Sequence, residues 1–385
     1  MRILHVIQSM NPAAGGPVEG IKQLIIINRA ASIEVVCLDE PDAPWLPDYK
    51  QLGITIHPIG KGYLKYGYSP HLVSWIKQHY QSFDSVIVNG IWQFHSFAAW
   101  LALKGTGKNY HVFIHGMLDP WFKYTFPLKH LKKWLYWPWA EYRVLRDATS
   151  VVFTCNEERI LARESFWLYK VNEKVISYGV PFPAHAKDVS IAAFLQKFPQ
   201  LKGRRYILFM GRINKKKGCD LLIRAFKDAA QADPELSLVI VGPDQYGWKS
   251  ELTALASDMG ISDKVYWPGM LTRELKWGAY YLAEAFCLPS HQENFGLVVA
   301  EALSCGLPVL ISNKVNIWRE IKECGAGIIE DDTVEGCRNM LLNWIGMNAD
   351  AKKAMIDKTI PCFEENFHIS KTLADLRAIL KADTQ

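Results

Sequence analysis

Two glutamates, Glu293 and Glu301, are the residues whose spacing says most about chemistry. They lie in the segment SHQENFGLVVAEALSCGLPVL, residues 290–310, eight positions apart. If the residues between them were helical, the two carboxylates would be separated by about 12 Å along the axis, too far to share a proton or a metal ion. We interpret them as acceptors of hydrogen bonds from hydroxyl groups at separate places on one long ligand. Glu301 could instead be an ordinary exposed helix residue, but its neighbours are apolar, and a carboxylate in that setting normally has a partner.

Anion-binding groups surround this pair in the sequence. The amides of Asn294, Phe295 and Gly296 precede the helix, where unpaired N–H groups and the positive dipole end can hold phosphate or sugar oxygens. Upstream, GRINKKKG (211–218) follows an apolar strand and supplies Arg212 and Lys217, a guanidinium fork and a point charge suited to a diphosphate. The lysines of this loop could also be a solvated charge run.

A glycine pair follows the first strand. Gly15 and Gly16 precede Pro17 and a helix, so the backbone could approach an anion closely at an open helix N-terminus. The spacing is not that of a dinucleotide-binding fingerprint, and a plain strand-to-helix turn is the other interpretation.

Short β-rich runs alternate with helical patterns along the whole chain. This layout predicts two doubly wound α/β domains, each with a parallel sheet, facing each other across a cleft, and ligands at the carboxyl ends of the strands. We expect a first domain over 1–182, a linker over 183–203 and a second domain over 204–363, with a C-terminal helix of about 364–385 packing back on the first domain. The expected strands are 2–7, 33–38, 54–58, 85–89, 110–114, 150–154 and 174–177, then 206–210, 236–242, 264–267, 285–288, 308–312 and 327–329.

The composition is that of an ordinary globular protein. The chain has 385 residues, is 49% hydrophobic and 22% charged, and carries a net charge of +5, all of it in the first 180 residues. Its eight cysteines are scattered without a C-x-x-C pair, and we read them as reduced thiols in a cytoplasmic protein. The N-terminal run is too short for a signal-peptide core, and no apolar run approaches a membrane span. No basic stripe in a recognised motif supports nucleic-acid binding.

The segment 121–143 concentrates the surplus charge. It holds five Lys/Arg, one Glu and nine aromatic residues, and an apolar stripe recurs at helical spacing. An interfacial helix resting on an anionic membrane surface has this composition. A core helix whose stripe packs on the sheet is the other interpretation. The stripe consists of Leu128, Leu131, Leu135, Trp139 and Tyr142.

With these motifs, the chain resembles the retaining glycosyltransferases of family 4, which have the GT-B fold of two Rossmann-like domains. The match is E-N-F-G-L-V-V-A-E-A-L-S-C-G-L-P-V with G-R-I-N-K-K-K-G upstream. In the first domain, F-D-S-V-I-V-N-G-I-W (83–92) and I-H-G-M-L-D-P-W (114–121) are similar to members that build bacterial surface polysaccharides and lipopolysaccharides. The resemblance extends over nearly the whole chain and is strongest over 211–308.

For the second domain, the resemblance implies a donor site for a nucleotide-sugar. Arg212 and Lys217 would hold the diphosphate, Glu301 the ribose, and Glu293 the donor sugar. The amides of Asn294, Phe295, Gly296 and Leu297 would hold sugar and phosphate oxygens, and YWPGML (266–271), with Met270, would take the nucleobase.

For the first domain, the resemblance implies that His115 lies beside the sugar near the reacting carbon and that Gly15 and Gly16 face the diphosphate. Asn89 stands where relatives often have His, and Ser177-Tyr178-Gly179-Val180 replaces a commoner P-N-G-V. Asn89 and Asp119 are the candidate acceptor contacts. Asp119 could orient an acceptor hydroxyl or cap the helix after Pro120.

The expected activity is that of a hexosyltransferase that moves a sugar, UDP-hexose being the first donor expected, to a glycan or lipid-linked acceptor. No metal or other cofactor is expected, because no Asp-x-Asp motif occurs and cations can replace Mg²⁺. We expect the protein in the cytoplasm, where it can associate with the inner face of the cell membrane. A sugar-nucleotide epimerase of the same fold and a non-catalytic nucleotide-binding partner are the alternatives.

Overall fold

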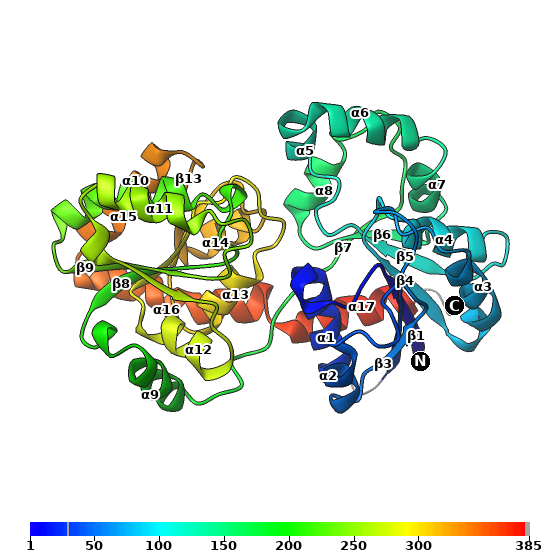
Figure 1. Ribbon diagram of the computed structural model, residues 1–385, viewed down its shortest axis with the longest axis horizontal. Helices are drawn as coiled ribbons and strands as arrows, with labels where there is room; N and C mark the ends of the chain where they lie inside the picture. The colour runs from blue at the N-terminus through cyan, green and yellow to red at the C-terminus, as the bar shows by residue number, and fades with distance from the viewer. Residues whose placement is uncertain (29–30, 382–385) are drawn as a thin grey trace. The chain divides into compact units, whose positions relative to one another are not determined.

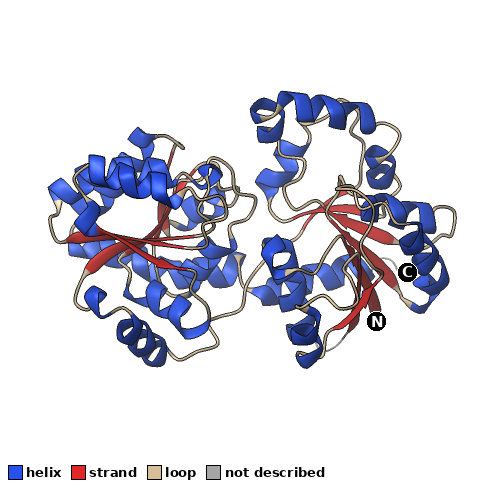
Figure 2. Ribbon diagram, in the orientation of Figure 1, coloured by secondary structure: helices blue, strands red, loops and turns tan. Residues whose placement is uncertain are grey.

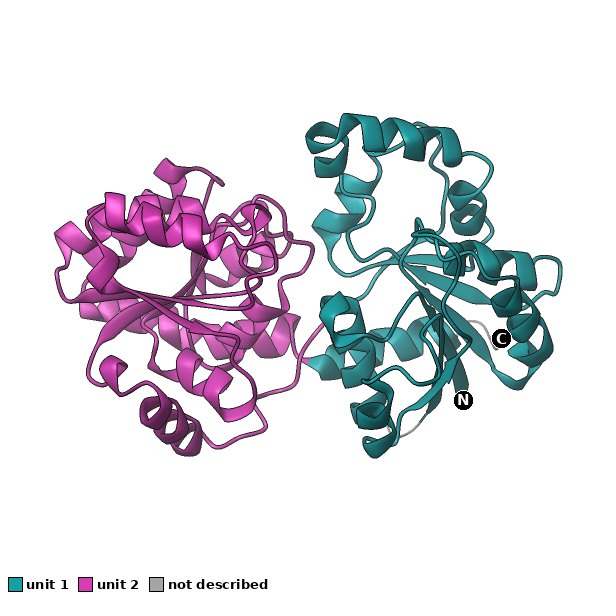
Figure 3. Cartoon of the chain, viewed as in Figure 1, with its two compact units in different colours: residues 1–178, 369–385 teal, residues 179–368 magenta. Residues whose placement is uncertain are grey.

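The computed structural model describes residues 1–28 and 31–381. The chain forms two compact units (Figure 3), of which unit 1 comprises Met1–Tyr178 and Ile369–Gln385 and unit 2 comprises Gly179–His368. Each unit is a parallel β-sheet with helices on both faces (Figure 2). The expected α/β class with two doubly wound domains is therefore confirmed.

Unit 1 is built on a seven-stranded sheet in the order β3-β2-β1-β4-β5-β6-β7, and all adjacent strands are parallel (Figure 1). Its strands are β1 (Arg2–Ile7), β2 (Ser32–Cys37), β3 (Thr55–Pro58), β4 (Ser85–Asn89), β5 (Tyr110–Phe113), β6 (Ser150–Phe153) and β7 (Glu173–Val175). Its helices are α1 (Gly16–Ile27), α2 (Leu46–Gln51), α3 (Pro70–His79), α4 (Phe94–Leu103), α5 (Trp121–Thr125), α6 (Pro127–Tyr136), α7 (Glu141–Arg146), α8 (Asn156–Ala162) and α17 (Ile369–Lys381).

The strands of unit 1 are apolar on both faces because each face has its own helical cover. In β4, Val86 and Val88 belong to a core shared with α3, α4 and α7, whereas Ile87 belongs to a core that includes Leu376 and Leu380 of α17. Burial on both faces is what produces a continuous apolar run in the sequence.

Unit 2 repeats the same topology with six parallel strands in the order β10-β9-β8-β11-β12-β13. Its strands are β8 (Arg205–Met210), β9 (Leu236–Val241), β10 (Val265–Gly269), β11 (Ala285–Leu288), β12 (Val309–Ser312) and β13 (Gly327–Glu330). Its helices are α9 (Lys187–Lys197), α10 (Cys219–Ala232), α11 (Lys249–Asp258), α12 (Arg273–Leu282), α13 (Leu297–Ser304), α14 (Trp318–Cys324), α15 (Val334–Gly346) and α16 (Ala349–Asn366).

The segment 183–203, expected as a linker, is instead part of unit 2 and contains α9. This helix packs against α12, where Gly278 lets the two backbones approach closely: a Cβ there would lie 2.3 Å from the carbonyl oxygen of Ser190 and 2.5 Å from Cβ of Phe194. Ser190 and Phe194 are both fully buried. The prediction is wrong because prolines flank a short helix that buries few apolar side chains.

The ends of the domains also differ from the expected boundaries. The chain passes from unit 1 to unit 2 after Tyr178 rather than after residue 182, and it returns at Ile369. Of the expected C-terminal helix of about 364–385, the portion 369–381 forms α17 on the sheet of unit 1, and 364–366 belong to α16. Residues 29–30 and 382–385 of the expected first domain and C-terminal helix lie outside the described residues.

Gly278→Ala is expected to lower the free energy of unfolding by about 1–3 kcal/mol, because the added methyl group overpacks the contact with α9. Equilibrium urea unfolding followed by circular dichroism measures this. Gly346→Ala is the control, since a Cβ there meets nothing within 4 Å. Equal stability of the two variants would contradict the role given to Gly278.

Candidate functional site

The candidate residues of unit 2 follow the two strands at which the strand order reverses. In this sheet β9 lies on one side of β8 and β11 lies on the other. Arg212 and Lys217 follow β8, and Glu293 follows β11. Ligands of doubly wound proteins bind at the carboxyl ends of the strands at this reversal point. The fold thus brings together the residues that the sequence separates by about eighty positions.

Glycines let the loops after three neighbouring strands pack backbone to backbone. A Cβ on Gly242, after β9, would lie 1.7 Å from the carbonyl oxygen of Gly211, after β8. Gly242 N–H donates to the carbonyl of Gly269 at the end of β10, and Gly211 N–H donates to that of Val241. No side chain fits between these loops, so the backbone at the end of β8 is held in one place.

Lys217 is positioned by contact between its loop and the end of β11. Gly218 has a φ of 67°, and a Cβ on it would lie 2.2 Å from the carbonyl oxygen of Pro289. The neighbouring Lys216 carbonyl accepts a hydrogen bond from His291 N–H at 2.8 Å. Lys217, which is 8% exposed, forms an ion pair with Glu293.

The electrostatics of this cluster favour an anion. Burial lowers the pKa of Lys217 to about 7, and the positive charges of Lys216 and Arg212 act in the same direction. The Glu293 carboxylate is the ion-pair partner of this ammonium group. Arg212 is exposed and forms no ion pair within the described part of the chain. A diphosphate would supply the negative charge that Arg212 lacks.

The loop before α13 presents backbone donors beside Glu293. Glu293 N–H donates to the carbonyl of Lys314, and Asn316 N–H donates to the carbonyl of Glu293, which fixes this loop against the end of β12. Gly296 caps α13 with a φ of 77°. In residues 1–28 and 31–381, the N–H groups of Gly296, Leu297 and Val298 form no hydrogen bond. Three backbone donors are thus available for an anion.

Of the remaining loop residues, Phe295 is 5% exposed and its ring lies 5.8 Å from that of Phe367. Only the backbone of Phe295 can therefore take part in binding. Asn294, in front of it, is half-buried.

Glu301 is a paired carboxylate rather than an ordinary exposed helix residue. Lys276 Nζ lies 2.5 Å from Oε1 of Glu301, and Tyr280 donates to Oε2 at 3.1 Å. Burial and the Glu301 charge hold the pKa of Tyr280 well above its usual range, so its hydroxyl stays a donor. Sequence reasoning missed Lys276 and Tyr280, although their i, i+4 spacing places both on one face of α12.

Met270 lies at the tip of the loop after β10 and is 69% exposed. Nearby in the sequence, the Trp267 ring lies 5.8 Å from Lys249 Nζ. In the described residues the structure assigns no protein partner to the Met270 side chain. The exposure of this side chain is the observation that fits the predicted contact with a nucleobase.

In unit 1 the candidate residues also gather at the reversal point, which lies between β1 and β4. Asn89 ends β4 and is 5% exposed, and its amide donates to Nδ1 of His5 at 3.1 Å. Its carbonyl oxygen Oδ1 lies 3.4 Å from Nε2 of His115 in the loop after β5. The Asn89 side chain thus contacts both His5 and His115, and its candidate role as an acceptor contact stays a prediction.

His115 is held neutral in a constrained conformation. It has a φ of 51°, which is uncommon for any residue but glycine. Burial lowers the pKa of His115 to about 3, and the nearby His5 acts in the same direction. Its ring lies 5.7 Å from those of Phe113 and Tyr178. A neutral imidazole here can donate or accept a hydrogen bond but carries no charge at physiological pH.

The glycine pair after β1 has the predicted backbone. Gly15 has a φ of 89° and caps α1, which begins at Gly16. Farther along α1, Gly20 lies directly over Tyr178: a Cβ there would lie 1.5 Å from the tyrosine hydroxyl. Tyr178, at the place where the sequence departs from its relatives, therefore packs between α1 and the His115 ring.

Asp119 has the geometry of a helix cap. Its Oδ1 accepts a hydrogen bond from Trp121 N–H at 2.8 Å, and its side chain is 9% exposed. Of the two interpretations, capping is the one for which the structure gives a contact.

The helix α6 has its apolar side outward, which the interpretation as a core helix does not explain. Leu128 is 83% exposed, Leu131 56% and Leu135 62%. Trp134 extends this surface to Trp167, whose ring lies 6.1 Å away. We call this surface the α6 face. It consists of Leu128, Leu131, Trp134, Leu135, Trp139 and Trp167, each more than 40% exposed.

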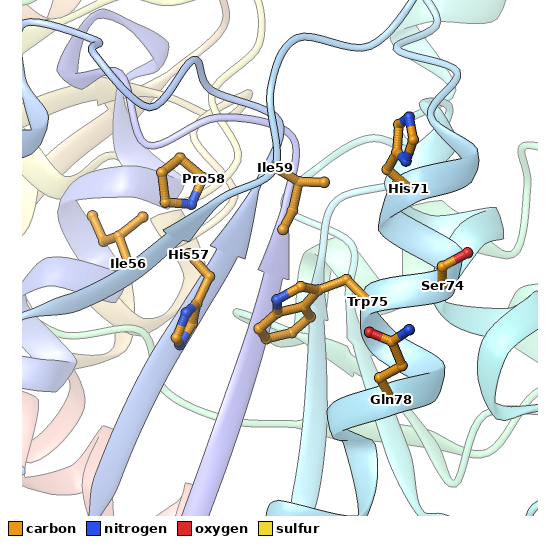
Figure 4. A pocket seen from close by; sticks show the side chains of 8 residues that line it. All are labelled: Ile56, His57, Pro58, Ile59, His71, Ser74, Trp75 and Gln78. Carbon is orange, nitrogen blue, oxygen red and sulfur yellow. The ribbon is translucent and has the colours of Figure 1, made fainter.

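A surface hollow in unit 1 lies apart from all candidate residues. It has a volume of about 610 Å³ and lies between β3 and α3 of unit 1 (Figure 4). The Trp75 ring stacks on His79 at 4.3 Å and lies 4.9 Å from that of His57. None of the predicted site residues lines it.

Three further observations bear on the sequence-based expectations. In the described residues no group of three or more His, Cys, Asp or Glu is placed to hold a metal ion. No helix in that part of the chain is long and apolar enough to cross a membrane. All eight cysteines are free thiols, and six of them are buried.

Comparisons with known proteins agree with the two-unit organisation. Residues 15–179 match the family model described as a glycosyl transferase 4-like domain, and residues 191–354 match that of the glycosyl transferases group 1. A GDP-mannose:cellobiosyl-diphosphopolyprenol alpha-mannosyltransferase of Xanthomonas campestris is 24% identical over 340 residues, which cover 86% of this chain and 83% of the relative. A D-inositol 3-phosphate glycosyltransferase of Salinispora tropica is 31% identical over 206 residues, 50% of this chain and 42% of the relative.

Solved structures share the fold over the full length. Anabaena HepE in complex with UDP and glucose has a TM-score of 0.79 at 16% identity and covers 99% of this chain and 100% of its own. The lipopolysaccharide glycosyltransferase WaaG has a TM-score of 0.63 at 15% identity, with 98% of both chains covered. At these identities the likeness shows the GT-B fold.

Proposed function

Since the chain belongs to the family 4 glycosyltransferases, we propose that it transfers a hexose, with retention of configuration, from a nucleotide-sugar to a lipid-linked glycan acceptor in surface polysaccharide or glycolipid synthesis. The observation that carries this proposal is the arrangement in unit 2. There, the buried Lys217–Glu293 pair, the unpaired Arg212 and the free amides before α13 meet at the reversal point of the sheet.

The donor half of the reaction follows from this arrangement. Arg212, Lys217 and the amides of Gly296 and Leu297 would bind the diphosphate and stabilise the negative charge it gains as the bond from the anomeric carbon to the phosphate oxygen breaks. The acceptor oxygen forms the new bond to that carbon on the same face, and its proton passes to the departing phosphate. Because a nucleoside diphosphate is already a good leaving group, no side chain has to act as a covalent nucleophile.

UDP-hexose remains the first donor to test. The support is the set of similar structures described as complexes with UDP, with UDP and glucose, and with UDP-glucose. The Xanthomonas relative is described as using GDP-mannose with a diphosphopolyprenol-linked acceptor, so GDP-mannose is the second donor to test and a lipid-linked acceptor is the first. The ribose contact would fall to Glu301, whose carboxylate Lys276 and Tyr280 already orient.

We further propose that the transfer needs no divalent metal. A metal ion would neutralise the diphosphate and polarise its oxygens. Arg212 and Lys217 can supply this charge themselves, as both follow β8 on the side where the donor would bind.

Isothermal titration with a panel of UDP-, GDP- and ADP-sugars should identify one donor that binds. Without an acceptor the protein should hydrolyse this donor slowly, and the rate of hydrolysis should be the same with and without excess EDTA. Glu301→Ala should weaken binding of that donor about tenfold or more, because a hydrogen bond to a charged group is lost.

Glu323→Ala is the matched control, because Glu323 is an exposed helical glutamate of the same unit. No binding of any nucleotide-sugar would overturn the proposed function. Activity that EDTA abolishes and Mg²⁺ alone restores would overturn the proposal of metal independence.

Donor affinity should also depend on pH through Lys217. With a pKa of about 7 in the free protein, the amine must take up a proton to bind the diphosphate above this pH, so the wild-type affinity should fall by roughly fiftyfold between pH 7 and 9. Lys217→Arg keeps its charge over this range, and its affinity should stay level. A nucleotide-sugar is the suitable ligand because its phosphates do not titrate there. A parallel decline in both proteins would exclude Lys217 as the titrating group.

The lipid-linked acceptor raises the question of how the protein reaches a membrane, and we propose that the α6 face docks on an anionic bilayer. The segment 121–143 has a net charge of +4, which contributes about 4 kcal/mol near such a surface. Micromolar binding needs about 8 kcal/mol. Insertion of Leu128, Leu131 and Leu135 at about 1.5–3 kcal/mol each would supply the rest.

Leu131→Glu should abolish co-sedimentation with vesicles of phosphatidylcholine and phosphatidylglycerol at low salt, because it places a carboxylate at the centre of the α6 face. Leu52→Glu, at a leucine of unit 1 that is 49% exposed, should leave sedimentation unchanged. Wild-type protein that stays in the supernatant would rule out docking by this surface.

A further inference from the structure

The apolar side of helix α6 faces outward, and its charged side chains lie on the side away from the α6 face. At 100° per residue, Lys129, His130 and Lys133 lie on the side opposite Leu131 and Leu135. These three residues line a cavity of about 60 Å³ beneath the helix. Typical pockets for whole small molecules are about 300–1,000 Å³, so this cavity takes a small charged group rather than a glycan.

Aromatic rings form the walls of this cavity and hold the two lysines in place. Lys133 Nζ lies 4.4 Å from the ring centroid of Trp92 and 5.4 Å from that of Phe122. Lys129 Nζ lies 4.8 Å from the ring of Phe126. Side chains fixed by cation–π contacts lose little further freedom when they bind an anion.

The lysine charges are not neutralised by the protein. Neither Lys129 nor Lys133 forms an ion pair in residues 1–28 and 31–381. Burial raises the pKa of Glu141, behind Lys133, to about 8, so this carboxyl is largely protonated at neutral pH and accepts from Trp92 N–H at 3.0 Å. Burial lowers the pKa of Lys133 only to about 8, which leaves it mostly charged. Asp119 also lines the cavity, where its Oδ1 accepts from Trp121 N–H, and the two lysines leave the lining with a net positive charge.

We propose that this cavity binds the phosphate or diphosphate group that links the acceptor glycan to its lipid. The inference rests on the proposed function, and it adds the contact by which unit 1 recognises the acceptor. The α6 face would lie on the bilayer, and the phosphate of a lipid in that bilayer would bind Lys129 and Lys133 on the other side of the same helix. Met117, two residues after His115, also lines the cavity and places it next to the loop that carries this histidine.

Farnesyl diphosphate is the soluble probe for this site. Inorganic pyrophosphate and farnesol, which correspond to its two halves, are the comparison ligands. Isothermal titration of the full chain should show that farnesyl diphosphate binds more tightly than either half and that saturating UDP or GDP does not displace it. The double variant Lys129→Gln/Lys133→Gln should bind it about tenfold more weakly or worse, because two charged donors are lost.

Lys132→Gln is the matched control, since Lys132 is an exposed lysine of the same helix that does not line the cavity. It should bind like the wild type, and Lys129→Arg/Lys133→Arg should restore affinity to the double variant. Unchanged affinity of the Gln double variant would overturn the inference, as would farnesol or pyrophosphate that binds as tightly as farnesyl diphosphate.

Nucleotide-sugar binding separates the two proposals. In the Gln double variant it should equal that of the wild type, which also shows that the variant is folded. If the Gln double variant binds nucleotide-sugars normally and binds farnesyl diphosphate as tightly as the wild type, the inference about the cavity has failed. Absence of nucleotide binding in the wild type, with farnesyl diphosphate still bound through the lysines, means that the proposed function has failed.

Discussion

The ion pair between Lys217 and Glu293 is the interaction on which the proposed donor site of unit 2 depends. Removing a lysine from water is costly unless a carboxylate meets it in good geometry. That geometry requires the loops after β8 and β11 to touch, which they do because Gly218 packs on the carbonyl of Pro289. The backbone of Glu293 is fixed in turn, because its N–H donates to the carbonyl of Lys314 and its carbonyl accepts from Asn316 N–H. The cation is thus in position before any ligand binds, and such preorganisation favours stabilisation of a leaving diphosphate.

The sheets could be predicted almost completely from the sequence. Strands buried on both faces appear as apolar runs between turns, and each of the thirteen expected strands overlaps one of β1–β13. The helix α9 could not be found in the same way, because its burial depends on Gly278 of a distant helix. The residues of the candidate site also differ in how far the sequence alone identifies them. Arg212 and Glu301 stand out by their apolar neighbours, whereas Lys276, Tyr280 and His5 acquire their roles only from tertiary contacts.

The helix α6 shows where a sequence pattern stops being informative. Its leucines at i, i+3 and i+7 fit a core helix and an interfacial helix equally well, because periodicity gives the angle between side chains but not the direction in which they face. The exposure of Leu128 and Leu135 shows that this stripe is not buried in a core. In an ordinary soluble helix Lys133 would face water, whereas here its ammonium lies over the Trp92 ring. The proposed docking of the α6 face on a bilayer and the proposed phosphate site both follow from this orientation of α6.

The return of the chain to unit 1 has a consequence for synthesis on the ribosome. Unit 2 is continuous, Gly179–His368, and can complete its core as soon as that stretch has emerged. Unit 1 cannot, since Ile3, Ile87, Phe113 and Val152 are covered by α17, which is translated only after unit 2. The first half of the chain to be translated is therefore the last to finish folding. The part of its sheet that packs on α17 stays uncovered until unit 2 has been translated, and such apolar surface is the kind that chaperones bind.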